Sequence, residues 1–191
     1  MAFDQLVVSF LVDEVFGGFF ISVPPGHVAC IYDRGRGVLT RVWKPGLHLK
    51  IPFWQKAKLF NARTLEYGMR KGGFDPSHKE ALGDEPINAV TSDNKTITIE
   101  GTILLRIDKE RVDKLWENIG EDFVSKIVRP VSRSRMRATI SNFTADEVIS
   151  TQRGAVENAI RQSLEEFMGE KGLIVEQVLL SEIDTASKSS L

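Results

Sequence analysis

The clearest alternation of hydrophobic and polar positions lies between Thr96 and Ile107. One side of the pattern holds apolar residues or glycine and the other holds mainly polar residues: Ile97, Ile99, Gly101, Ile103, Leu105 and Ile107 against Thr96, Thr98, Glu100, Thr102 and Arg106. A period of two residues is that of a β-strand, whose side chains point alternately to opposite faces. The pattern predicts one long strand with a single face in a hydrophobic core.

After this strand the period changes to that of helices. Asp108 is the expected N-cap of a first helix that ends at Gly120, because a short acidic side chain caps free backbone N–H groups. Its apolar face holds Val112, Leu115, Trp116 and Ile119. A second helical stretch is predicted from about Glu121 to Ser141, with Pro130 as a kink or boundary.

The last part of the chain predicts a third helix and a final strand. Thr144 and Glu147 have the spacing of a capping box. The helix runs from about Thr151 to Glu170, and one of its faces holds Val156, Ala159, Ile160, Ser163, Leu164 and Phe167. The segment Leu173–Leu180 is apolar enough to form the closing strand.

The first half of the chain predicts short strands and turns. The segments His27–Asp33 and Val38–Val42 read as a hairpin joined by a glycine-rich turn. A half-buried strand is expected around residues 47–51, where Leu47, Leu49 and Ile51 alternate with His48 and Lys50. Phe53 and Trp54 are interpreted as packing residues, and Gly68–Pro86 as a mobile surface loop.

Together these elements predict an α+β fold, with an antiparallel β-rich first lobe followed by a strand–helix–helix–strand second lobe. The expected boundaries are residues 1–25 for an apolar start, 26–90 and 91–184 for the two lobes, and 185–191 for a polar tail.

The apolar start reads LVVSFLVDEVFGGFFISV from Leu6 to Val23 and has no basic residue. The missing basic residues argue against a secretory signal. A membrane-spanning helix would place Asp13 and Glu14 in mid-span, where each acid costs about 2.5–3.5 kcal/mol. The alternatives are two apolar arms in one leaflet, divided at Gly17-Gly18, or packing on the chain's own domain or a neighbouring subunit. The predicted membrane contacts are Leu6, Val7, Val8, Phe10, Leu11, Phe16, Phe19, Phe20 and Ile21.

Composition excludes some classes of partner and cross-link. The 191 residues carry 25 Lys and Arg against 26 Asp and Glu, so no overall field favours nucleic acid as a partner. The single cysteine, Cys30, cannot form an internal disulfide and fits a reducing compartment. Cys30 alternates with Val28 and Tyr32, which indicates a core position, with acylation as the less favoured reading.

Catalytic chemistry finds little support. The histidines His27, His48 and His78 lie on separate predicted elements, and the sequence has no nucleophile elbow, phosphate loop or zinc-binding helix motif. We therefore expect no catalytic residue, no metal ligand and no cofactor.

One basic cluster stands apart. Five basic residues and no acid occur between Lys126 and Arg137, and at helical spacing one face holds Lys126, Arg129, Arg133 and Arg137. The simpler interpretation is a solvated helix face balanced by acids elsewhere. The functional interpretation is a contact with anionic lipid headgroups or with an acidic patch on a neighbouring subunit.

Five segments in order resemble the stomatin/prohibitin/flotillin superfamily, the SPFH or Band 7 domain, with prohibitins the most similar. They are Val23–Arg63 with its PGLH and IPF motifs, Thr91–Asp108, Asn118–Phe123, the helix start at Thr151–Arg153, and Gly172–Asp184. The resemblance implies a two-lobed α+β domain that is not an enzyme. It also implies that Phe3–Val23 anchors the domain to a membrane, with the domain facing a reducing or intracellular compartment at a bacterial or mitochondrial inner membrane.

The resemblance implies partners as well: related subunits in homo- or hetero-oligomers, membrane lipids and a membrane-bound protease. Family members continue into a coiled coil that drives assembly, whereas this sequence ends in a polar tail, which predicts either a truncated chain or weak assembly. The leading hypothesis is a non-catalytic membrane scaffold that self-associates. The alternative is a soluble adaptor that docks one protein partner through its apolar start.

Overall fold

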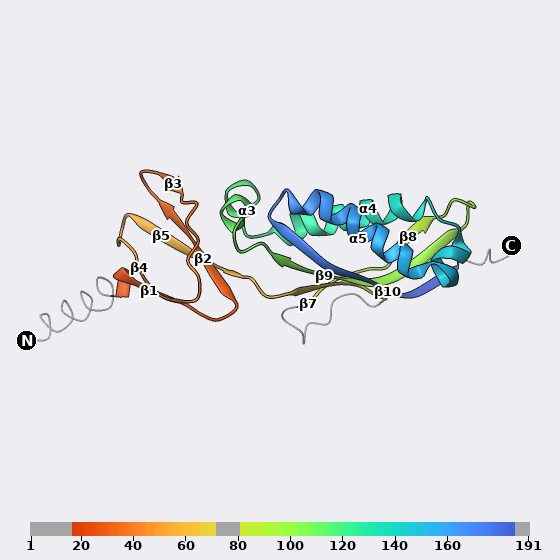
Figure 1. The fold of residues 1–191 in the computed structure, drawn as a ribbon, viewed down its shortest axis with the longest axis horizontal. Coiled ribbons are helices and arrows are strands. Elements are labelled where there is room, and N and C mark those ends of the chain that lie inside the picture. Colours follow the sequence, from red (N-terminus) through yellow and green to blue (C-terminus); the bar gives the residue numbers. More distant parts are fainter. Residues whose placement is uncertain (1–16, 72–80, 186–191) are drawn as a thin grey trace, which may run out of the picture. The chain divides into compact units, whose positions relative to one another are not determined.

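The computed structural model describes residues 17–71 and 81–185, which form an α+β fold in two units (Figure 1). Unit 1 holds the described residues up to 63 together with 107–120, and unit 2 holds the described residues of 64–106 and those from 121 onward. The α+β prediction is confirmed. The expected lobe boundary near residue 90 falls inside unit 2, because Leu65–Met69 and Ile87–Val90 both pair with the same long strand.

Unit 1 is built from two small antiparallel sheets. The first pairs β1 (Phe20–Val23) with β4 (Gly46–Leu49). The second has the order β3 (Gly37–Val38), β2 (His27–Asp33), β5 (Gln55–Asn61). Their shared core consists of Val23, Ala29, Ile31 and Trp43. Burial of these four side chains ties β1 to the larger sheet.

Two helices complete unit 1. The short α2 (Gly17–Phe19) leads directly into β1, and α3 (Val112–Asn118) contacts β2. The Phe60 and Trp116 rings pack edge to face with their centroids 6.1 Å apart, which holds α3 against β5.

The predicted hairpin in unit 1 is partly confirmed. The strand His27–Asp33 has the bounds predicted from the sequence. The partner expected at Val38–Val42 is shorter. Strand β3 ends at Val38, although the Leu39 N–H still donates to the Ile31 carbonyl at 2.8 Å, and an isolated bridge then joins Ala29 to Trp43.

Unit 2 is built around one long strand, β9 (Thr96–Ile107). Its sheet has the order β10 (Leu173–Thr185), β9, β6 (Leu65–Met69), β7 (Ala81–Asp84), and β8 (Ile87–Val90) also pairs with β9. The β6–β7 pair is parallel, whereas β6 and β8 are each antiparallel to β9. The predicted inward face of β9 is confirmed, since its five Ile and Leu side chains are at most 1% exposed.

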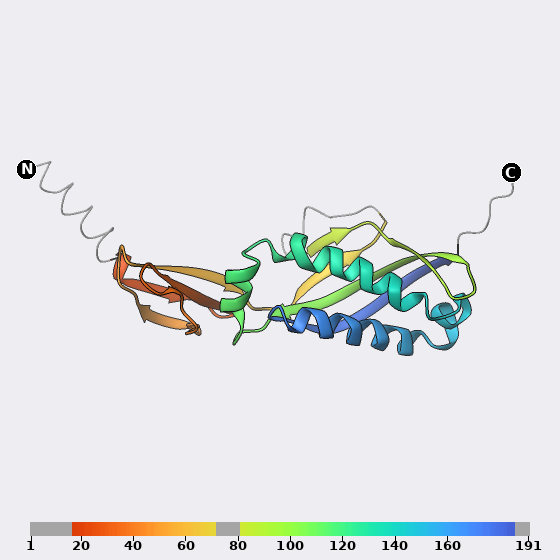
Figure 2. The ribbon, with the colours of Figure 1, turned by 90° about the horizontal axis from the view of Figure 1, so that it is seen from above.

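Two helices cover one face of this sheet and run side by side, as Figure 2 shows. They are α4 (Arg129–Ile140) and α5 (Arg153–Gly169), each preceded by a π-helical segment, Val124–Val128 and Glu147–Thr151. The predicted capping box is present: the backbone N–H of Thr144 donates to Glu147 at 2.8 Å, and that of Glu147 donates to the Thr144 hydroxyl at 3.4 Å.

Two predictions of where a secondary-structure element begins or lies are wrong. Asp108 does not cap α3; its carboxylate accepts the backbone N–H of Glu110 in a turn, and the helix begins four residues later, at Val112. The segment Gly68–Pro86 is not a loop throughout, because Gly68 and Met69 end β6 and Ala81–Asp84 pairs with it as β7. Residues 72–80 lie outside the described part.

None of the helices in the described ranges has both the length and the apolar character needed to cross a bilayer.

Candidate functional site

Six large hydrophobic side chains of unit 1 are more than half exposed, between 51% and 73%. They are Phe20, Leu47, Leu49, Ile51, Phe53 and Trp54, and we call them the apolar face. No other large hydrophobic side chain in the described residues exceeds half exposure. Isolated exposed hydrophobics are common, but a group of this size within one small unit indicates an interaction surface.

The register of β1 with β4 creates the first half of the apolar face. Phe20 lies opposite Leu49 and Ser22 opposite Leu47, so these four share one side of the ribbon. The other side holds Ile21 and Val23, which pack on the core, and His48, whose ring stacks on Trp43 at 5.0 Å. Because that inner side is filled, Leu47 and Leu49 point outward.

The half-buried strand predicted near residues 47–51 is present, but the side of it that faces the core is the opposite of the one expected. The alternation is real, but Leu47, Leu49 and Ile51 are exposed, and the inward position between the two leucines belongs to His48. The backbone of β4 continues toward α2, where the N–H of Lys50 donates to the Phe19 carbonyl at 2.8 Å.

A tight turn carries the second half of the apolar face. Phe53 has φ of 62°, a left-handed conformation that a bulky aromatic residue rarely adopts and that costs about 1–3 kcal/mol. The turn is closed by the Gln55 N–H donating to the Ile51 carbonyl at 2.8 Å, and by the Ile51 N–H donating to the Gln55 side chain at 3.1 Å. Phe53 and Trp54 are thus displayed at the surface, which corrects their interpretation as packing residues.

Asp33, at the end of β2, fixes this turn. Its carboxylate accepts the Trp54 indole N–H at 3.2 Å, the Gln55 amide at 3.0 Å and the Arg36 guanidinium at 3.0 Å. The hydrogen bonds from Gln55, Arg36 and the backbone of Gly35 hold the pKa of Asp33 well below its usual range, although its burial acts the other way. Sequence reasoning missed this role; an Asp at a strand end before glycine-rich turn residues is the signal that could have found it.

The predicted membrane-contact residues fall into two groups. Leu6, Val7, Val8, Phe10, Leu11 and Phe16 lie outside the described residues. Of the other three, Phe19 ends α2, Phe20 belongs to the apolar face, and Ile21 packs against the core of unit 1.

The predicted basic face lies on unit 2, where two of its residues, Arg129 and Arg133, contact the Asp84 carboxylate. Arg129 donates two hydrogen bonds to the Asp84 carboxylate, at 2.7 and 3.0 Å, and Arg133 lies 3.3 Å from it. Arg133 also donates to the Glu85 carbonyl, and Arg137 donates to the Asn88 carbonyl at 3.1 Å. These arginines tie α4 to the β7–β8 connection, while Lys126 lies in the π-helical segment before α4.

Tyr67 completes this cluster, because its hydroxyl donates to Asp84 at 3.1 Å. Burial and the neighbouring Asp84 carboxylate raise the pKa of Tyr67 to about 12. Burial alone would raise the pKa of Asp84, but the hydrogen bonds from Arg129, the Glu85 backbone and Tyr67 outweigh it and lower that pKa. Asp84 gave no sequence signal, since it sits in the segment that we expected to be a loop.

Cys30 is placed as predicted, in the core, and it is fully buried. Burial first, and then the negative charge of Asp113, raise the pKa of its thiol to about 12. A thiol that is neutral at pH 7 and closed to solvent is a poor nucleophile. Within the described ranges, no three His, Cys, Asp or Glu side chains are grouped so that they could hold a metal ion.

Comparison with known proteins identifies related sequences. The model of the SPFH domain / Band 7 family matches residues 21–189. Prohibitin 1 of Gallus gallus is 27% identical over 162 residues, which cover 85% of this chain and 53% of that protein. Prohibitin-7, mitochondrial, of Arabidopsis thaliana is 23% identical, covering 87% and 54%, and the mitochondrial prohibitin complex protein 1 of Caenorhabditis elegans is 25% identical, covering 85% and 53%. The chain spans about half the length of these relatives.

Proposed function

The chain belongs to the SPFH domain / Band 7 family and is prohibitin-like, and from this premise we propose that it is a non-catalytic scaffold that associates with a membrane and with copies of itself or related subunits. The resemblance described above supports two extensions of the proposal. One is a membrane-anchored protease as a regulated partner. The other is a location at a bacterial or mitochondrial inner membrane.

The apolar face carries the membrane part of the proposal. Its side chains come from β1, from β4 and from the turn that follows β4, and Phe53 is held outward in a strained backbone conformation. Moving such side chains from water into an apolar phase is worth on the order of 1 kcal/mol each when they are half exposed at the start. In the sequence, the apolar residues from Leu6 onward come immediately before α2 and β1.

The self-association part rests on family membership. The relative from Caenorhabditis elegans is named as a member of a prohibitin complex, and this chain matches about half of it. We infer that the SPFH domain of this chain also packs side by side with related domains. Analytical ultracentrifugation in solution and crosslinking on vesicles test this directly, and a chain that stays monomeric at high concentration in both settings contradicts it.

Vesicle flotation of the full chain tests the membrane part. Leu49→Ser and Phe53→Ser each remove a side chain of the apolar face without touching the core, and we expect each to reduce the floating fraction. Val90→Ser is the matched control, because Val90 is half exposed on unit 2 and lies outside the apolar face.

Two outcomes contradict the membrane proposal. If the unaltered chain does not float, the apolar face serves a protein interface and the adaptor hypothesis takes its place. If the chain floats but Leu49→Ser and Phe53→Ser behave like Val90→Ser, the apolar face is not the membrane contact.

A further inference from the structure

We propose that unit 1 recognises an anionic membrane surface, with the apolar face in the acyl region and the Lys and Arg side chains around it contacting lipid headgroups. This inference rests on the proposed membrane function and adds to it the class of lipid and the residues that select it.

The charge of unit 1 is strongly one-sided along the strands that build the apolar face. Residues 17–63 contain eight basic side chains: Arg34, Arg36, Arg41, Lys44, Lys50, Lys56, Lys58 and Arg63. They contain one acid, Asp33, which is 2% exposed and already paired with Arg36. The other part of unit 1, residues 107–120, has three basic and four acidic residues and is nearly neutral. The strands and turns of unit 1 therefore carry a local positive charge, which the whole-chain net charge of −1 does not reveal.

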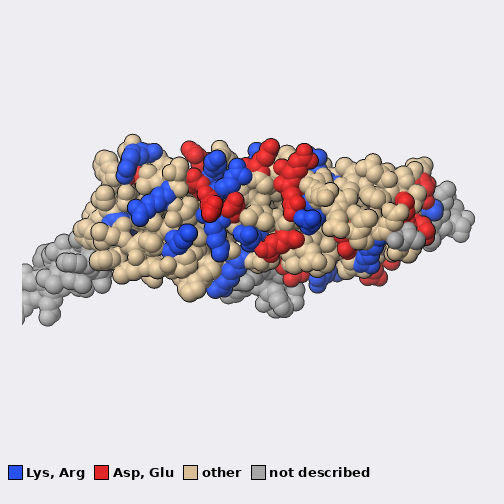
Figure 3. All heavy atoms as spheres, in the orientation of Figure 1, with Lys and Arg blue, Asp and Glu red and all other residues tan. Residues whose placement is uncertain are grey.

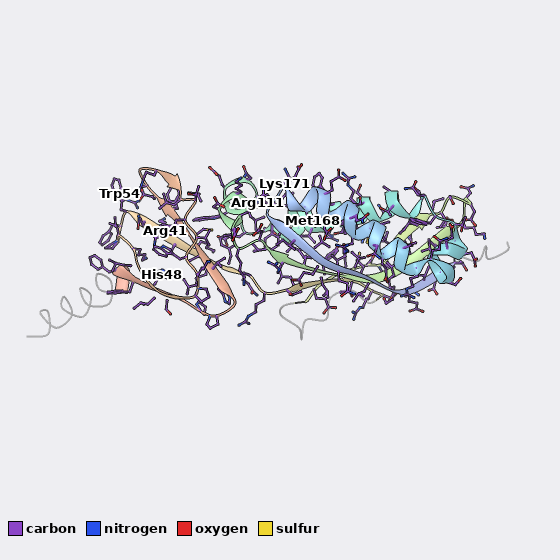
Figure 4. All side chains as sticks on the ribbon, viewed as in Figure 1. Arg41, His48, Trp54, Arg111, Met168 and Lys171 are labelled. Carbon is purple, nitrogen blue, oxygen red and sulfur yellow. The ribbon has the colours of Figure 1, made fainter. Side chains whose placement is uncertain are left out.

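The space-filling view shows the same separation. On the face drawn in Figure 3, the strand part of unit 1 carries blue Lys and Arg atoms with very little red, whereas acidic and basic side chains are mixed elsewhere. Arg41 lies among the strands of unit 1, as do His48 and Trp54 (Figure 4).

Three of these basic residues lie close in the sequence, or through a backbone hydrogen bond, to residues of the apolar face. Lys50 follows Leu49 and precedes Ile51, and Lys44 stands two residues before β4, where its carbonyl oxygen lies 2.6 Å from the His48 ring nitrogen. Arg34 lies beside Trp54, because its backbone N–H donates to the Trp54 carbonyl at 3.1 Å. Among the described residues, none of the three forms an ion pair with an acidic side chain.

The presence of apolar and basic groups in the same part of unit 1 favours an anionic bilayer as the partner. An apolar surface alone would enter any bilayer weakly, and a basic surface alone would be released by physiological salt. Stable attachment takes two such contributions, and a basic rim makes the second one depend on anionic lipid. An acidic protein surface could offer the same charge, but the apolar residues from Leu6 onward, which precede unit 1 in the sequence, favour a bilayer, because they add hydrophobic residues to those of β1.

Vesicle binding by the full chain tests this inference. The probes are vesicles of phosphatidylcholine alone and of phosphatidylcholine mixed with phosphatidylglycerol. We expect clear preference for the mixed vesicles, and the double variant Lys44→Glu with Lys50→Glu should lower partitioning to them roughly 30-fold or more. Its matched control is Lys109→Glu with Lys114→Glu, which makes the same charge change in the nearly neutral segment 107–120 and should bind like the unaltered chain.

The possible results separate this inference from the proposed function. Equal binding to both vesicle types, unchanged by Lys44→Glu with Lys50→Glu, overturns the anionic selection and leaves membrane association standing. Binding to neither vesicle type overturns both. A loss of equal size in the Lys109→Glu, Lys114→Glu control also overturns the inference, because it shows a response to net charge and not to the basic residues around the apolar face.

Discussion

Asp33 connects the buried end of β2 to the turn that displays Phe53 and Trp54. It accepts hydrogen bonds from the side chains of Trp54, Gln55 and Arg36 while being 2% exposed. A buried carboxylate with several donors strongly favours its charged form. The position of the turn that carries Phe53 and Trp54 therefore depends on one ionised side chain that is not itself part of the apolar face.

The first prediction concerns the pH dependence that follows. The pKa of Asp33 is lowered by folding, so its contribution to stability is present above the unfolded value of about 3.8 and is lost as pH falls below it. Asp33→Asn removes this contribution at neutral pH, so the variant should melt below the unaltered chain at pH 7. The gap in melting temperature should narrow below about pH 4, because the unfolded chain binds a proton at Asp33 there while the folded carboxylate resists protonation. Thermal unfolding followed by circular dichroism measures both, and a gap that stays constant with pH contradicts the assignment.

The second prediction concerns two strand glycines. A Cβ on Gly101 in β9 would lie 2.6 Å from the Leu179 backbone oxygen, whereas a Cβ on Gly68 in β6 meets nothing within 4 Å. Gly101→Ala should therefore destabilise the protein by roughly 1–3 kcal/mol, because backbone cannot move aside as a flexible side chain can. Gly68→Ala is the matched control and should be neutral or slightly stabilising. Urea unfolding measures both, and equal effects would contradict the close approach of β9 and β10.

At the scale of elements, long periodic segments were predictable and short ones were not. In β9 the structure buries the residues that the pattern selected. In α5 it buries Val156, Ile160 and Leu164 of the predicted face and also Met168, while Ala159, Ser163 and Phe167 are only partly buried. β4 shows the same alternation, but periodicity distinguishes two sides without telling which one meets the core. Here Ile21, Val23 and the stacked Trp43 and His48 fill the inner side, so tertiary packing reversed the expectation.

The contacts of α4 in unit 2 were also not predictable from local sequence pattern. The basic residues of α4 were visible in the sequence, but their acceptor Asp84 lies 45 residues from Arg129, at the end of a strand that the glycine-rich composition concealed. The two π-helical segments likewise have no composition that separates them from ordinary helix. Long-range partners of this kind follow from sheet pairing and could not be read from local pattern.

The third prediction tests the tie between α4 and the sheet. The chain has two tyrosines, so a Tyr32→Phe background leaves Tyr67 as the only phenol to titrate. Its ionisation should have a midpoint at a pKa of about 12, with burial and Asp84 as causes. Adding Asp84→Asn removes a negative charge and leaves Arg129 and Arg133 in place, so the pKa should move down toward its ordinary value of about 10. Ultraviolet absorbance of tyrosinate against pH measures the shift; an unchanged midpoint contradicts the cluster.

At the scale of the whole molecule, the two units expose different chemistry. Unit 1 presents the apolar face together with eight basic residues in 17–63. Unit 2 covers one face of its sheet with α4 and α5 and carries ion pairs, among them Arg106 with Glu176 at 2.9 Å and Lys71 with Asp184 at 2.6 Å. Paired surface charges add little affinity for an outside partner, whereas Lys44 and Lys50 of unit 1 have no ion pair among the described residues. This difference supports the proposal that unit 1, and not unit 2, contacts the membrane.

The last prediction separates the apolar face from the residues before it. A chain that begins at Gly17 keeps β1, so it should melt within a few degrees of the full chain and retain part of its vesicle binding. A chain that begins at Pro24 also loses Val23, which is 2% exposed in the core, so it should be less stable and bind more weakly still. Melting temperature and vesicle flotation are measured together, so that a folding defect is not mistaken for lost affinity. If the chain from Gly17 folds normally yet binds no vesicle, membrane contact belongs to residues 1–16 alone, and the apolar face must be covered by another protein surface.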